Sequence, residues 1–129
     1  ISDERLAELI NLIDEGKVST SVASQKITIG NAIYSAAKGA LNSFTKSLAL
    51  ELAPKQIRVN AILPGMVQTA ILDSGAVSDE QLQIHLKNYP LGRFGQPQDI
   101  AGLTVYLMAD VSQWMTGSLI VLDGGYTLK

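Results

Sequence analysis

The clearest chemistry in the sequence is a phenol and an ammonium four residues apart, at Tyr34 and Lys38. On a helix, side chains at positions i and i+4 lie on the same face, one turn apart. A cation about 5 Å from a phenol favours its charged form, and a tyrosine so placed becomes a candidate general acid–base group. The pair is a weak signal by itself, because a Tyr and a Lys at this spacing also occur by chance on many helices.

Two other groups of residues could complete such a site. Ser21 lies thirteen residues before the tyrosine, and the segment 64–69 follows a predicted strand with the sequence P-G-M-V-Q-T. Each has an ordinary structural explanation as well. The neighbours of Ser21 are also hydroxyl residues, which favours a surface turn, and Thr69 could cap the turn that follows it. The single histidine, His85, has no acidic partner in register, so we interpret it as a surface or substrate-facing residue.

A long helix is expected to carry the Tyr–Lys pair. Residues 32–53 contain one glycine and no proline, apolar residues such as Phe44 and Leu48 recur at spacings of three and four, and Pro54 ends the pattern. Residues 57–63 alternate and are rich in β-branched side chains, so they predict a strand.

The remaining elements indicate the class of fold. A capping box at Ser78 opens a second helix that presents Leu82, Leu86 and Tyr89 on one face. A third begins at Pro97, with Ile100, Leu103, Tyr106 and Leu107 pointing inward, and a last strand covers residues 118–122. Strands separated by helices require crossovers, and therefore predict an α/β fold with a largely parallel sheet. Upstream, residues 2–15 read as a short amphipathic helix.

Taken in order, these motifs resemble the short-chain dehydrogenase/reductase family. The matching pieces are Y-S-A-A-K at 34–38, Ser21 at the family's serine-to-tyrosine spacing, I-R-V-N-A-I-L-P-G-M-V-Q-T at 57–69, G-Q-P-Q-D-I-A at 95–101 and T-G-S-L-I-V-L-D-G-G at 116–125. Several motifs in the right order make the resemblance specific for residues 28–129. It implies the C-terminal half of a doubly wound, Rossmann-like parallel-sheet domain, preceded by a short helical segment.

The resemblance also implies roles for individual residues. Tyr34 would exchange the proton with a carbonyl or alcohol oxygen, Lys38 would support it and hold the nicotinamide ribose, and Ser21 would bind the substrate oxygen. The cofactor, NAD or NADP, would lie against a set of residues after the strand: Pro64, Gly65, Val67 and Thr69. Residues 71–89 would form a substrate lid. A small ketone or secondary alcohol would be the substrate, and homo-oligomers would form through the 32–53 helix and the C-terminal strand.

The first half of the family's domain has no counterpart in this sequence. No two of the eleven glycines are separated by a single residue, so the G-x-G element of a phosphate-binding loop is absent. Residues 1–27 instead resemble the helical tail of the B subunit of tRNA-dependent amidotransferases, which suggests a fusion. Because the chain begins with Ile1, we expect residues to precede it, and we expect these 129 residues alone to bind nicotinamide cofactor poorly, if at all.

Composition excludes several other functions. The net charge of −2 argues against a nucleic-acid partner, and no apolar run approaches the roughly 20 residues that span a bilayer. Without cysteine, thiolate metal sites and cysteine nucleophiles are ruled out, and we expect no metal. Hydrophobic residues make up 47% of the chain, as in a soluble, cytoplasmic protein with a core. Two alternatives to an enzyme stay open: a fragment or fusion that serves as a folding or assembly module without turnover, and, less favoured, a tRNA-associated interaction module.

Overall fold

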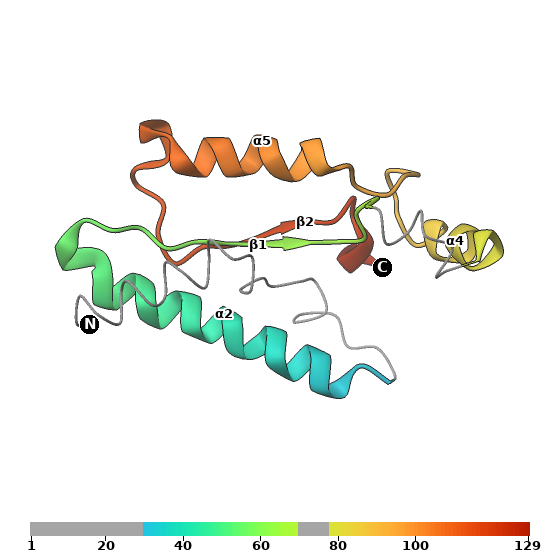
Figure 1. Ribbon diagram of the computed structural model, residues 1–129, viewed down its shortest axis with the longest axis horizontal. Helices are drawn as coiled ribbons and strands as arrows, with labels where there is room; N and C mark the ends of the chain where they lie inside the picture. Colours follow the sequence, from blue (N-terminus) through green and yellow to red (C-terminus); the bar gives the residue numbers. More distant parts are fainter. Residues whose placement is uncertain (1–29, 70–77) are drawn as a thin grey trace.

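The computed structural model describes residues 30–69 and 78–129, and its elements follow the predicted order (Figure 1). The helices and strands are α2 (Ala32–Leu52), β1 (Ala61–Pro64), α4 (Asp79–Leu86), α5 (Pro97–Met108) and β2 (Leu119–Leu122). Short 3-10 turns lie at η2 (Ala53–Lys55), η3 (Asp110–Ser112) and η4 (Tyr126–Leu128). The predicted helix at 2–15 lies outside the described residues.

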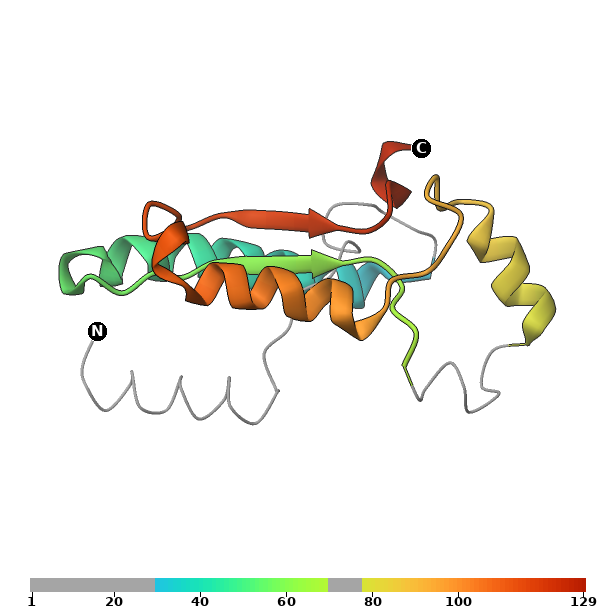
Figure 2. The same ribbon diagram turned by 90° about the horizontal axis from the view of Figure 1, so that it is seen from above.

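The two strands pair in parallel, which confirms the predicted α/β fold. Ala61 lies opposite Leu119 and Pro64 opposite Leu122. Helix α2 lies on one side of this sheet and α5 on the other, so the described chain has three layers (Figures 1 and 2). A parallel pair needs a crossover, and the segment containing α4 and α5 provides it.

Helix α2 buries a stripe of side chains, although the stripe is rotated from the predicted one. Thr45, Leu48, Ala49 and Leu52 are buried at helical spacing, whereas Phe44 is exposed. The small Ala49 faces Gly117 just before β2, where a Cβ on the glycine would lie 3.5 Å from the Cβ of Ala49. This close approach favours a small residue at position 49, and Phe44 lies outside the buried stripe.

Strand β1 is shorter than the predicted strand 57–63. Ahead of Ala61, side-chain hydrogen bonds take the place of regular backbone pairing between strands. The Arg58 guanidinium donates to the carbonyls of Leu107 (2.6 Å) and Met115 (3.2 Å). The side-chain amide of Asn60 donates to the Met115 carbonyl (3.0 Å), and its Oδ1 accepts the Ser118 N–H (3.1 Å). These bonds, together with the backbone hydrogen bond from the Gly117 N–H to the Val59 carbonyl, join the approaches to the two strands without a continuous ladder.

Helix α5 places Ile100, Leu103 and Leu107 in half-buried positions, as predicted, but Tyr106 is exposed. Consecutive helical residues are about 100° apart around the axis, which turns Tyr106 away from the face that holds Leu107. No helix within residues 30–69 and 78–129 is both long and apolar enough to cross a membrane.

Candidate active site

The predicted site residues that the structure describes lie toward the same end of the molecule, although α2 diverges from the sheet toward its N-terminal turn (Figure 1). Both strands point toward this end, and the N-terminal turn of α2 reaches it as well (Figures 1 and 2). In open parallel sheets, ligands bind at the carboxyl ends of the strands. The N-terminal turns of α2 carry Tyr34 and Lys38, and the loop after β1 carries the predicted cofactor residues. Ser21 lies outside the described residues.

The predicted contact between the tyrosine and the lysine is present. The Lys38 Nζ lies over the ring of Tyr34, 5.3 Å from its centroid. Such a cation–π contact requires the two side chains to share one helix face. Tyr34 keeps 48% of its surface exposed, so its hydroxyl is accessible to a ligand. The helix begins at Asn31, whose carbonyl accepts the Ser35 N–H at 2.8 Å.

The loop after β1 is held from both sides. Gly65 donates its N–H to Leu122 (3.1 Å), which is the last bond between the two strand ends. The Met66 N–H then donates to the hydroxyl oxygen of Tyr89 (2.9 Å), and the Met66 carbonyl accepts the Gly95 N–H (2.9 Å). Because Gln68 donates to the Gly95 carbonyl (2.8 Å), Val67 and Gly95 form a parallel β-bridge.

The backbone N–H and C=O of Val67 are not used by this bridge. In this bridge the N–H and C=O of Gly95 are used, whereas those of Val67 face the opposite side of the extended chain. Within the described ranges they make no hydrogen bond. Thr69 is exposed two residues further on, where it also leaves its hydroxyl accessible. The loop therefore presents a donor–acceptor pair that an amide ligand could match.

Tyr89 is a structural residue of this site, and its predicted position is wrong. The pattern after Ser78 placed it on one helix face with Leu82 and Leu86, but α4 ends at Leu86 and Tyr89 lies in the turn beyond. Only 6% of its surface is exposed. Burial raises the pKa of its hydroxyl, although the hydrogen bond from Met66 works in the opposite direction. A signal was available in the sequence, since a tyrosine directly before Pro90 indicates a turn rather than a helix end.

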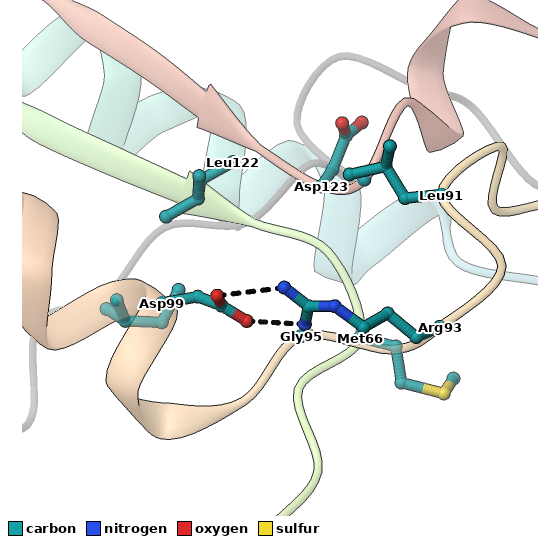
Figure 3. A pocket seen from close by; sticks show the side chains of 9 residues that line it. Met66, Leu91, Arg93, Gly95, Asp99, Leu122 and Asp123 are labelled. Carbon is teal, nitrogen blue, oxygen red and sulfur yellow. Dashed lines mark hydrogen bonds and ion pairs between the residues drawn. The ribbon is translucent and has the colours of Figure 1, made fainter.

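A pocket of about 210 Å³ lies beside the loop, between the strand ends and α5 (Figure 3). Within it Arg93 and Asp99 form a two-pronged ion pair, with N···O distances of 2.7 and 3.0 Å. The Arg93 guanidinium, together with the Gln96 N–H that donates to the Asp99 carboxylate (2.7 Å), lowers the pKa of Asp99 to about 2. Met66 and Asp123 line the pocket, whereas none of the predicted catalytic or cofactor residues within the described ranges does. The pocket is therefore distinct from the predicted site.

A parallel sheet with helices on both faces, and with its candidate chemistry at the carboxyl end, defines the doubly wound α/β class. The profile of a family described as enoyl-(acyl carrier protein) reductase matches residues 17–127. The chain belongs to the short-chain dehydrogenase/reductase family, to which that profile and the relatives below point. Ser21 lies inside the matched range and residues 1–16 lie outside it.

Curated relatives and solved structures agree with this assignment. The chain is 41% identical over 107 residues to an uncharacterised oxidoreductase of Methylorubrum extorquens, covering 82% of this chain and 43% of that protein. It is 38% identical to a 3-oxoacyl-(acyl-carrier-protein) reductase of Aquifex aeolicus over 106 residues, 82% of this chain and 42% of the relative. The chain thus spans less than half the length of these relatives.

Among solved structures, a 4-hydroxyisoleucine dehydrogenase complexed with NADH superimposes with a TM-score of 0.81 at 32% identity, over 95% of this chain and 53% of the other. A second structure, with bound NADP, is provisionally described as a 2-deoxy-D-gluconate 3-dehydrogenase of Agrobacterium tumefaciens. It superimposes with a TM-score of 0.78 at 34% identity, over 85% of this chain and 45% of the other.

Proposed function

We propose that the chain is the catalytic half of an NAD- or NADP-dependent oxidoreductase that interconverts a ketone and a secondary alcohol. The observation that carries this proposal is the contact between Tyr34 and Lys38 at the carboxyl end of the parallel sheet. Relatives in the same family are oxidoreductases by name, and two of the similar structures contain NADH or NADP.

The loop after β1 suits a nicotinamide cofactor. The carboxamide of nicotinamide has one donor and one acceptor group, and the backbone of Val67 offers the complementary pair. Pro64 and Gly65 bring the chain to this point, and the exposed Thr69 adds a hydroxyl. When bound, the cofactor would supply the hydride chemistry, which no side chain of the protein can perform.

The side chains would manage the proton. Tyr34 would donate its hydroxyl proton to a carbonyl oxygen, or accept one from an alcohol, as a general acid–base. Lys38, already in contact with the ring, would favour the phenolate and hold the ribose hydroxyls. Ser21 would hydrogen-bond the substrate oxygen, a role supported by its position inside the range that matches the family.

The outer face of α2 supports association between copies of the chain. Ile33 and Leu50 are largely exposed on this helix, and exposed apolar side chains are available for burial at an interface. We therefore keep the proposal of a cytoplasmic homo-oligomer built on α2 and the C-terminal strand. Sedimentation equilibrium tests it, and a monomer at micromolar concentration would contradict it.

One sequence observation favours a second candidate, a folding or assembly module without turnover. The G-x-G element is absent, so the usual cradle for the pyrophosphate is missing from these residues. On this alternative, residues 1–27 would be a foreign segment similar to the amidotransferase tail.

Titration with NADH and with NADPH, followed by cofactor fluorescence, decides between the two candidates. Saturable binding is expected but weak, on the order of 1 mM, because only the nicotinamide end is contacted. Micromolar affinity would show that this chain binds the cofactor tightly without the glycine loop. Absence of binding for both cofactors would favour the assembly module.

A further inference from the structure

Tyr89 is deeply buried, yet the proposed chemistry assigns it nothing to do. Its ring stacks on Tyr126 (centroids 5.0 Å apart, planes at 25°) and meets Phe94 edge to face (5.2 Å, 84°). Two glycines make room for it. A Cβ on Gly65 would lie 3.2 Å from Tyr89 Cε1, and one on Gly124 would lie 3.4 Å from Cδ1. The ring thus lies between the ends of both strands.

Packing accounts for the ring but not for the hydroxyl. The Tyr89 oxygen accepts the N–H of Met66 at 2.9 Å, and the carbonyl of the same residue accepts the Gly95 N–H at 2.9 Å. Both backbone groups of Met66 are therefore held by one short segment, 89–95. Because the next residue is Val67, these two bonds set the direction in which its unused N–H and C=O point.

We infer that Tyr89 is a positioning residue for the cofactor: its hydroxyl holds the Met66 peptide so that the Val67 backbone faces the nicotinamide carboxamide. This inference rests on the proposed function. It assigns a role to a side chain that lies within the expected lid, 71–89, but whose hydroxyl is hydrogen-bonded to the loop after β1. Helix α4, by contrast, extends away from the sheet (Figure 2), and it meets the anchor only at its last residue, where the Leu86 carbonyl accepts the Tyr89 N–H at 3.0 Å among the described residues.

Because the anchor runs through the Tyr89 hydroxyl, we expect the loop after β1 to be insensitive to changes elsewhere in the expected lid. The chain leaves the bridge at Val67 and returns to it at Gly95, with Tyr89 on the returning side. Substitutions on the exposed face of α4, such as Ile84→Ala, are therefore expected to leave the Met66–Val67 backbone unchanged. This difference between two parts of one segment follows from the hydrogen bonds and cannot be read from sequence spacing.

The test compares Tyr89→Phe with Tyr106→Phe, which makes the same change at an exposed tyrosine on α5. Amide hydrogen exchange is measured for Met66 and Val67, with Leu52 reporting on the core, and NADH affinity is measured by fluorescence. Losing one hydrogen bond corresponds to about a fivefold to tenfold change. Tyr89→Phe is expected to accelerate exchange at Met66 by at least that factor, to leave Leu52 unchanged and to weaken NADH binding similarly. Tyr106→Phe is expected to change neither.

Three results would overturn the inference. Unchanged exchange at Met66 would show that the hydroxyl does not hold the loop. Equal acceleration at Met66 and Leu52 would reveal a purely structural role. Faster exchange at Met66 with unchanged NADH affinity would show that the anchor does not position the cofactor. If the parent chain binds no NADH, the proposed function fails, and the role in binding fails with it; the exchange data then still report whether Tyr89 anchors the loop.

Discussion

Gly65 and Asp123 lie in direct backbone contact where the two strands end. A Cβ built on Gly65 would lie 3.0 Å from both the Cα and the Cβ of Asp123, closer than side chains normally approach. Asp123 in turn organises the turn after β2, accepting the N–H of Gly125 (2.9 Å) and of Thr127 (2.8 Å). Burial raises the pKa of its carboxyl, but these hydrogen bonds outweigh it and the net pKa is lowered. The site is thus built on a junction where a side chain at position 65 would force its neighbours to shift.

Substituting Gly65 by Ala is therefore expected to destabilise the protein. The added methyl group meets backbone rather than a flexible side-chain end, which costs about 1–3 kcal/mol as overpacking. Urea denaturation measures the change. Gly102→Ala is the control, because a Cβ there has no neighbour within 4 Å on α5, and it is expected to stabilise by about 0.5–1 kcal/mol. Equal stability for both variants would contradict the close junction.

Helix α2 provides a matched pair of leucines. Leu52 is 1% exposed and Leu50 is 79% exposed. Leu52→Ala is expected to lower the free energy of unfolding by about 2–5 kcal/mol, because it leaves a cavity between the helix and the sheet. Leu50→Ala is expected to change it by no more than about 0.5 kcal/mol. A large loss at position 50 would instead indicate that this face is covered by another copy of the chain.

The Arg93–Asp99 pair makes stability depend on acid pH. The pKa of Asp99 in the folded protein is about 2, below the ordinary value of 3.8. Its stabilising contribution is therefore complete above about pH 5 and is lost as the pH falls from about 4 to 2. The contribution is modest because both side chains are partly exposed to solvent.

Thermal unfolding of the parent and of Asp99→Asn between pH 2 and 7 tests this dependence. The parent is expected to have the higher Tm near neutrality, and the two values are expected to converge toward pH 2. A difference that stays constant across the range would show that charge does not contribute to the pair.

Substituting Tyr34 by Phe removes the proposed proton donor while keeping the ring under Lys38. If the chain, alone or with its partners, reduces a ketone with NADH or NADPH, the variant is expected to lose about 10²- to 10⁴-fold in kcat. Cofactor oxidation at 340 nm is a suitable assay, and Tyr106→Phe controls for loss of a tyrosine elsewhere. Full activity in Tyr34→Phe would eliminate the acid–base role.

Local patterns in the sequence predicted most of the elements that carry the site. Helix α2 was predicted at 32–53 and occurs at Ala32–Leu52, because residues before Pro54 contain no helix breaker other than Gly39. The capping box at Ser78 is present, with the Gln81 N–H donating to the Ser78 hydroxyl oxygen at 3.3 Å. Strand β1 was less accurately predicted. The side chains of Arg58 and Asn60 bond to residues more than forty positions away, which no local pattern reveals.

The sequence by itself determined the contact between Tyr34 and Lys38 and the fold class, because both depend on short-range spacing: four residues place the two side chains on one helix face, and helices between strands require a parallel sheet. Only the tertiary structure decided how the loop after β1 is held. Tyr89 reaches Met66 across 23 positions, and Gly95 pairs with Val67 across 28. Such contacts depend on where the chain returns after a long excursion, and the packing of the two strand ends around Gly65 determines that return.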